Sequence, residues 1–151
     1  MKRYGLILFL AIILVGCTNE VTDETIKEEN NKVDLVYKEV EFTNSSIKVE
    51  ENTSVGYKEL RVIDDPQELK QLEDVLNRLA WEKAKVEMSV PPHFRFVSDE
   101  GFFAIWVTPK KDRIEMKIEG ENLYQVLSAE DSKLLFQLLT GIKLSDYDKW
   151  Y

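Results

Sequence analysis

Two basic residues, a short apolar run and a single cysteine open the chain, and this order constrains the rest of the molecule more than any other feature. Lys2 and Arg3 precede an unbroken apolar stretch from Leu6 to Val15. A basic start, a short apolar region and a small residue before a cleavage point are typical of secretory signals. The stretch is shorter than the about 20 residues that a membrane-spanning helix needs. We therefore expect residues 1–16 to be a signal peptide.

The end of the stretch, Leu14-Val15-Gly16-Cys17, resembles the lipobox of bacterial lipoproteins. This resemblance implies that a diacylglyceryl group is attached to the sulfur of Cys17, that cleavage follows Gly16, and that fatty acids such as palmitate anchor the protein outside the cytoplasm on the cell membrane. Whether the new amino terminus of Cys17 is also acylated is left open. Two acyl chains anchor a protein stably, whereas one gives only marginal attachment. The alternative is an uncleaved membrane stub with an incidental cysteine.

Cys17 is the only cysteine of the 151 residues, so no disulfide can form within a lipidated chain. The folded part must depend on its own apolar core, despite an expected location where disulfides are common. The chain holds 28 acidic and 20 basic residues, a net charge of −8, and loss of residues 1–16 removes Lys2 and Arg3 and leaves −10. This balance argues against nucleic-acid binding, which needs a basic surface.

Residues 17–35 are expected to form the lipidated cysteine and an acidic, disordered tether. Between Thr18 and Lys32 the segment has almost no large apolar side chain, so it cannot bury enough surface to offset the entropy of ordering. Its acidic residues repel one another and extend it. One α+β domain is then expected over residues 36–151.

Period-two alternation and β-branched or aromatic residues predict a series of strands in this domain. The expected strands are residues 36–42, 47–50, 57–63, 94–97, 102–107, 113–118 and 124–127. Short turns such as Ser98-Asp99-Glu100-Gly101 join several of them, which favours an antiparallel meander.

Two helices have clear end signals. Asp65 is the expected N-cap of the first, because Pro66 and Glu68 follow it at the first and third helical positions. Its apolar stripe is Leu69, Leu72, Leu76 and Leu79. The second helix is expected to begin after Ser128 and to end at Gly141. Its expected apolar face is Leu134, Leu135, Leu138 and Leu139.

Together these elements predict an α+β fold, a mostly antiparallel meander sheet with two helices packed on one face. Segment 84–92, Ala-Lys-Val-Glu-Met-Ser-Val-Pro-Pro, the aromatic strand 102–107 and the closing helix 134–139 resemble the YhfM-like lipoproteins of Firmicutes over about residues 55–141. An acid–aromatic pair often follows the proline in that family, whereas His93 and Phe94 stand here. The resemblance implies the fold and the lipid anchor, and no activity.

We expect no catalytic residue, no metal, no cofactor and no enzymatic activity. His93 is the only histidine, and we interpret it as a surface residue beside a Pro-Pro turn, since no nucleophile motif surrounds the nearby serines. One histidine without a free cysteine cannot complete a tetrahedral metal site. Pairs of acidic residues do occur, and sequence alone does not fix their separation. They are Asp64–Asp65, Asp99–Glu100, Glu119–Glu121 and Asp146–Asp148.

Strand 102–107 is apolar on both sides, which makes it the candidate binding face. One set of alternate residues is Phe103, Ile105 and Val107, and the other is Phe102, Ala104 and Trp106. The next strand has a charged side, so the second set is expected to form an exposed aromatic patch that binds a partner. The alternative is that residues 36–50 or the tail 147–151 cover this patch, because two-sided apolar strands are usually buried.

The sequence therefore favours a lipid-anchored, extracytoplasmic binding or interaction domain of unknown ligand. Its expected partners are the membrane, through the lipid on Cys17, and a protein of the cell envelope. Two alternatives stay open: a cell-envelope hydrolase with a scattered carboxylate site, and an accessory subunit of a membrane protein.

The Cys17→Ser variant is expected to remain an unlipidated precursor, because no other thiol can form the thioether. Metabolic labelling of cells with a palmitate analogue checks this. The unaltered protein should carry the label, and the variant should carry none. Label that persists on the variant contradicts the lipoprotein assignment.

Overall fold

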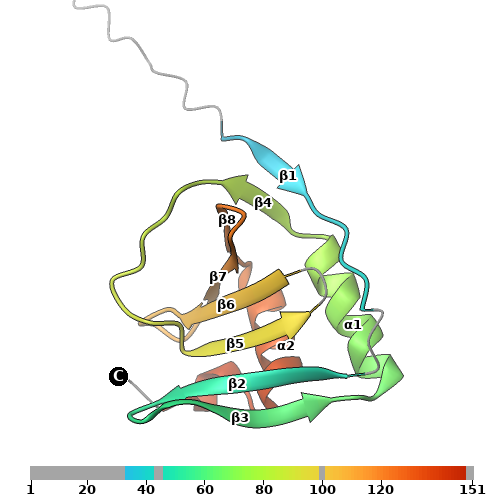
Figure 1. Cartoon of the computed structure of the whole chain (residues 1–151), viewed down its shortest axis with the longest axis vertical. Coiled ribbons are helices and arrows are strands. Elements are labelled where there is room, and N and C mark those ends of the chain that lie inside the picture. Colours follow the sequence, from blue (N-terminus) through green and yellow to red (C-terminus); the bar gives the residue numbers. More distant parts are fainter. Residues whose placement is uncertain (1–32, 43–45, 99–100, 149–151) are drawn as a thin grey trace, which may run out of the picture. The chain divides into compact units, whose positions relative to one another are not determined.

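One antiparallel sheet with two helices organises the part of the chain that the structure, a computed structural model, describes (Figure 1). That part comprises residues 33–42, 46–98 and 101–148, so Cys17 lies outside it. The strands are β1 (Leu35–Tyr37), β2 (Ile47–Thr53), β3 (Gly56–Ile63), β4 (Ala80–Lys83), β5 (Phe94–Ser98), β6 (Gly101–Val107), β7 (Ile114–Glu119) and β8 (Leu123–Val126). The helices are α1 (Pro66–Asn77), α2 (Ala129–Thr140) and the 3-10 helix η1 (Leu144–Asp146).

The strand order is β1-β4-β8-β7-β6-β5-β2-β3, and every neighbouring pair is antiparallel. Strands β5 to β8 are neighbours in chain order and form the predicted meander, and the hairpin β2–β3 extends the sheet beside β5. In Figure 1, α2 lies behind β5 and β6. The predicted α+β fold class is confirmed.

Both helices begin where their capping residues predict. The Oδ1 atom of Asp65 accepts hydrogen bonds from the backbone N–H groups of Gln67 (2.8 Å) and Glu68 (3.0 Å), which satisfies two donors at the start of α1. At α2, Ser128 Oγ accepts from the N–H of Asp131 at 3.0 Å. Helix α2 ends at Gly141, whose φ of 78° is left-handed and favours glycine.

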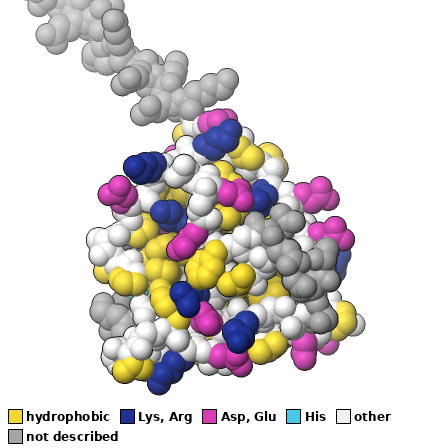
Figure 2. Space-filling model, in the orientation of Figure 1, with side chains coloured by type: hydrophobic (Ala, Val, Ile, Leu, Met, Phe, Trp, Pro, Cys, Tyr) yellow, Lys and Arg dark blue, Asp and Glu magenta, His cyan; other side chains and the backbone are white. Residues whose placement is uncertain are grey.

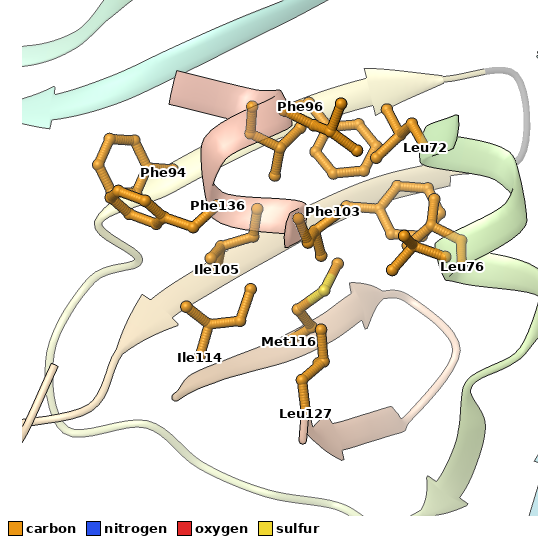
Figure 3. Close-up of a cluster of buried hydrophobic side chains, with 14 of the residues drawn as sticks. Leu72, Leu76, Phe94, Phe96, Phe103, Ile105, Ile114, Met116, Leu127 and Phe136 are labelled. Carbon is orange, nitrogen blue, oxygen red and sulfur yellow. The ribbon is translucent and has the colours of Figure 1, made fainter. Parts of the chain in front are cut away.

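The core lies between the helices and one face of the sheet (Figure 3). The rings of Phe96 and Phe103 stack there at a centroid distance of 4.5 Å, and Phe94 meets Phe136 of α2 edge to face at 5.4 Å. From α2, the buried residues include Leu135, Phe136, Leu138 and Leu139. Leu134 is 38% exposed, so its predicted place on the apolar face is wrong. At 100° per residue it lies beside the stripe that Ser132, Leu135 and Leu139 define.

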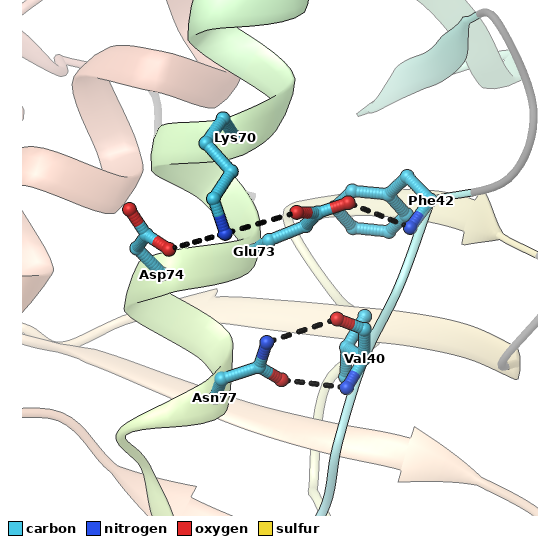
Figure 4. Close-up of polar contacts among 6 residues, drawn as sticks. All are labelled: Val40, Phe42, Lys70, Glu73, Asp74 and Asn77. Carbon is cyan, nitrogen blue, oxygen red and sulfur yellow. Dashed lines mark hydrogen bonds and ion pairs between the residues drawn. The ribbon is translucent and has the colours of Figure 1, made fainter.

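The connection from β1 to β2 is held by side chains of α1 rather than by a strand ladder (Figure 4). The Asn77 carboxamide accepts from Val40 N at 2.6 Å and donates to Val40 O at 3.0 Å. The Glu73 carboxylate accepts from Phe42 N at 2.9 Å. These contacts explain why the predicted strand 36–42 stops at Tyr37. At its other end β1 begins at Leu35, one residue before the expected domain start.

The β4–β5 connection crosses the sheet face opposite the helices, and we call residues 84–92 the strap. Three side chains of that face donate hydrogen bonds to strap carbonyl groups. They are Lys117 to Val86 O, Trp106 to Val90 O (2.8 Å) and Tyr57 to Pro92 O (2.9 Å). Because these groups come from three strands, the strap is tied across the sheet. The sequence patterns predict neither a strand at β4 nor a segment at residues 84–92 that covers the sheet.

The candidate binding face of Phe102, Ala104 and Trp106 is therefore not the exposed patch that the sequence predicts. Ala104 is fully buried, Trp106 is 6% exposed, and Phe102 is half-buried. The physical reason is the strap, which removes the centre of this face from solvent. Tyr147 of the tail does not cover it. Its ring packs on the helix side, 5.3 Å from that of Phe94.

Trp106→Ala is expected to lower the free energy of unfolding by about 3–5 kcal/mol, the typical cost of truncating a buried aromatic side chain. Trp106→Phe keeps most of the ring but loses the hydrogen bond to the strap, so about 1 kcal/mol is expected. Val97→Ala is the control, because Val97 is 53% exposed on a neighbouring strand. Urea unfolding measures all three. A Trp106→Ala variant as stable as Val97→Ala would contradict burial under the strap.

Candidate binding surface around helix α2

The orientation of α2 is set by a buried serine and leaves one side of the helix exposed. Ser132 is fully buried, and its Oγ accepts a hydrogen bond from Ile114 N of β7 at 3.0 Å. Because this contact and the core leucines fix the helix rotation, the opposite side faces solvent. Its exposed residues include Lys133, Leu134 and Gln137.

A groove of about 460 Å³ lies between α2 and the first turns of α1, and we call it the Arg61 groove. Arg61 of β3 donates from Nη1 to Leu138 O of α2 (3.0 Å) and from Nη2 to the Glu68 carboxylate of α1 (2.7 Å). The arginine thus satisfies a carbonyl near the end of α2 and joins the two helices. The lining of the groove is mostly polar, with Gln67, Gln71 and Gln137 among it, and its apolar side chains are Leu134 and Leu138.

A second hollow of about 300 Å³ lies on the other side of α2, and we call it the lysine pocket. Its lining is Lys111, Lys133, Gln137, Lys143, Leu144 and Ser145. The three lysines come from the β6–β7 turn, from α2 and from the residue before η1. Gln137 lines both hollows, so the Arg61 groove and the lysine pocket meet at this residue.

A third hollow of about 410 Å³ lies beside β1, and its lining is Tyr37, Lys38, Glu39 and Asn77. Lys38 pairs there with Glu121 at 2.8 Å. Asn77 already uses its carboxamide to hold the β1–β2 connection. Two of the four side chains that line this hollow, Lys38 and Asn77, are therefore used within the fold, which makes it a weaker candidate.

His93 is a structural residue, and the prediction that it lies on the surface is wrong. It is only 8% exposed, and its Nδ1 accepts a hydrogen bond from the N–H of Val107 at 3.1 Å. Its backbone also joins β2 to β6, since its N–H donates to Ile105 O and its carbonyl accepts from Asn52 N, each at 2.8 Å. Burial lowers the pKa of the imidazole below its usual 6.5.

The acidic pairs noted in the sequence do not assemble into a visible catalytic pair. Asp65 caps α1, Glu121 binds Lys38, and Asp146 accepts a hydrogen bond from Ser145 Oγ at 3.0 Å. Asp99 and Glu100 lie outside the described residues. Among the residues that the structure describes, no group of three His, Cys, Asp or Glu side chains could hold a metal ion, and no helix is long and apolar enough to cross a membrane.

Basic and acidic side chains lie interspersed among hydrophobic ones on the face shown in Figure 2, and several charged groups on the strap side of the sheet have partners. Arg95 donates from Nε to the Glu50 carboxylate at 2.6 Å, and its guanidinium lies 3.8 Å from the ring centre of Tyr57. Tyr124 donates to the Glu115 carboxylate at 2.7 Å. Burial, with the nearby Glu115 carboxylate, raises the pKa of the Tyr124 hydroxyl, so this group stays protonated at neutral pH.

A scan against protein-family models finds no match for the chain, and a search of curated proteins finds none. Among solved structures, the chain is similar to a thioesterase-like protein from Clostridium sporogenes, with 19% sequence identity and a TM-score of 0.48. The match covers 68% of this chain and 100% of the other. A similarity at this level supports no argument about activity, and the resemblance to the YhfM-like lipoproteins stays a prediction.

The residues around α2 were not singled out from the sequence. Lys111, Lys133 and Lys143 are separated by 22 and 10 positions, and no motif links them. The sequence carried no signal at Leu134 either, because it lies four positions before Leu138 and so shares the apolar face that the helical periodicity predicts. The meeting of the two hollows at Gln137 depends on the packed fold.

Acid is expected to destabilise the protein through His93. Because its folded-state pKa lies below 6.5, the unfolded chain takes up a proton at a higher pH than the folded chain does. The stabilisation is therefore complete above pH 6.5 and is lost as the pH falls below it, with a slope of at most about 1.4 kcal/mol per pH unit.

The His93→Asn variant serves as the comparison, because the amide oxygen can accept the Val107 N–H and does not titrate. Urea unfolding between pH 7.5 and pH 5 measures both proteins. The unaltered chain should lose more stability over this interval than the variant. Equal losses in the two chains would show that His93 does not carry the effect.

Proposed function

We propose that this protein is a lipid-anchored, extracytoplasmic, non-enzymatic domain that binds an envelope partner through the exposed side of α2. The observation that carries the proposal is the meeting of the Arg61 groove and the lysine pocket at Gln137. Two adjoining hollows on one rigid helix give a concave, chemically varied surface. Binding sites are concave in this way and combine apolar area with a few placed polar groups.

The composition of this surface also suits binding. Leu134 is 38% exposed, and Ile142, directly after the end of α2, is 46% exposed. These two apolar side chains are accompanied on the same surface by the carboxamide of Gln137 and the ammonium group of Lys133. Protein interfaces combine an apolar centre with a polar rim, so a partner could bury the two apolar residues and pair the polar ones.

Other parts of the domain are already engaged within the fold, which supports binding over catalysis. The strap covers the centre of the second sheet face, and the His93 imidazole accepts a backbone hydrogen bond. A hydrolase would need an accessible acid and base or an activated nucleophile. An accessory subunit of a membrane protein would use the same α2 surface, with that membrane protein as the partner.

The lipid anchor fits a binding role. It would hold the domain at a membrane whose anionic lipids its net negative charge does not favour. A partner in the envelope would then meet the domain at a high local concentration, because both are confined to one surface.

Site-specific photo-crosslinking in intact cells tests this proposal. A photoreactive amino acid replaces Leu134 or Gln137 in the full chain, and adducts are detected by gel mobility and by mass spectrometry of the modified peptide. Discrete adducts are expected at both positions, because both line the proposed surface.

Two exposed positions away from α2 serve as controls. Val97 lies on β5 and is 53% exposed, and Tyr37 lies at the third hollow and is 71% exposed. Neither should give the adducts seen at Leu134 and Gln137. Equal yields at all four positions, or adducts at Val97 alone, would contradict binding through α2.

A further inference from the structure

We propose that the sheet edge at β1 lies against the headgroup region of the membrane to which Cys17 would anchor the chain. This inference rests on the proposed function, because it requires the lipid anchor, and it assigns a second surface beside that of α2. We call residues 33–37 the edge segment. Its contact side chains are Val33, Leu35 and Tyr37, and the occupant is a lipid bilayer surface.

The edge segment exposes apolar side chains at three alternate positions. Val33 is 50% exposed, Leu35 53% and Tyr37 71%. The register explains why, because Val36 lies opposite Trp81, which is fully buried on the core side of the sheet. Successive side chains of a strand point to opposite faces, so Leu35 and Tyr37 point away from the core. Val33 continues the alternation, and the three positions form one apolar stripe.

The place of the edge segment in the chain indicates a bilayer as its occupant. Cys17 precedes Val33 by 16 residues, and a chain of this length spans at most about 55 Å when fully extended. A lipidated Cys17 would therefore keep the edge segment within that distance of a membrane. Confinement of this kind gives a high local concentration, so even a small apolar contact holds the domain against the surface.

The chemistry of the edge segment suits the headgroup region. Tyrosine is enriched there, because its ring is apolar and its hydroxyl reaches water. Within the described residues, the outer N–H and C=O groups of β1 have no partner strand, since β1 is the first strand of the sheet order. Such groups cannot enter hydrocarbon, where they would lose their hydrogen bonds to water. The contact is therefore expected to be shallow.

Two ion pairs lie beside the edge segment. Lys38 binds Glu121 at 2.8 Å, and Lys83 binds Asp34 at 3.3 Å. An ion pair has no net charge, so neither pair adds to the repulsion between an acidic chain and anionic lipid. Because the proposed contact is apolar, it should change little between low and high NaCl, whereas an electrostatic contact would be screened.

Contact through the edge segment would leave the α2 surface free. Strands β1 and β3 are the two ends of an eight-stranded sheet, so seven strand spacings, roughly 34 Å along the sheet, separate them (Figure 1). Arg61 of β3 donates to Leu138 O of α2 at 3.0 Å, so the Arg61 groove lies beside the edge that is far from β1. A domain held at β1 therefore presents the α2 surface away from the bilayer, toward an envelope partner.

Fluorescence quenching by spin-labelled lipids tests the proposal. Cys17 is the only cysteine of the chain and its sulfur would be in the thioether, so in a Leu35→Cys variant a thiol-reactive fluorophore attaches at position 35 alone. The full lipidated chain is placed in phosphatidylcholine vesicles with a lipid spin-labelled either near the headgroup or at the end of the acyl chain. Quenching by the shallow label is expected, with weaker quenching by the deep label and no loss at high NaCl.

The opposite edge of the sheet supplies the controls. Val62 is 43% exposed on β3, and a fluorophore on Val62→Cys should not be quenched. With the fluorophore at position 35, the double variant Val33→Glu, Tyr37→Glu should abolish the quenching. Leu60→Glu with Val62→Glu adds the same charge at the opposite edge and should leave the quenching unchanged.

Equal quenching at positions 35 and 62, none at position 35, or stronger quenching by the deep label would each overturn the proposal. Fluorescence that rises on dilution with unlabelled chain would assign the edge segment to a second copy of the protein instead. Flotation of the vesicles separates the possible failures. Protein that floats but is not quenched overturns this inference and leaves the proposed function standing, whereas protein that does not float contradicts the lipid anchor and thereby both.

Discussion

The burial of β6 on both faces is the constraint on which the rest of the structure depends. On one face, Phe103 and Ile105 pack beneath the helices, and on the other, Ala104 and Trp106 lie beneath the strap. Because β6 is covered on both faces, the sheet is held between the helices on one side and the strap on the other. It also removes the middle of the sheet from contact with partners, so the surface available for binding moves outward to α2.

The charged side chains are arranged differently on the strap side of the sheet and on the side of α2. On the second sheet face, charged groups are mutually satisfied, as with Arg95 between Glu50 and the ring of Tyr57. Three lysines line the lysine pocket, and no acidic residue is among its described lining. The chain as a whole has a net charge of −8, so the excess of basic residues at this pocket is confined to a small part of the surface.

Local signals made much of the fold predictable, and non-local contacts account for what was missed. Asp65 and Gly141 mark helix ends through backbone groups a few residues away, so sequence alone locates α1 and the end of α2. Strand β4 has only four residues, too few for a period-two pattern to stand out. The strap depends on hydrogen bonds from residues 57, 106 and 117, and the exposure of Trp106 could not be judged without them. The lysine pocket likewise forms only when three distant segments pack together.

Hydroxyl-radical footprinting of the protein in intact cells and after purification tests most directly the claim that β6 is covered and α2 is the binding surface. The account predicts slow oxidation of Trp106 in both samples, with Tyr37 of the purified protein, 71% exposed, as the fast reference. It also predicts that Leu134 is oxidised in the purified protein and protected in cells. Oxidation of Trp106 at the rate of Tyr37, or equal oxidation of Leu134 in the two samples, would contradict it.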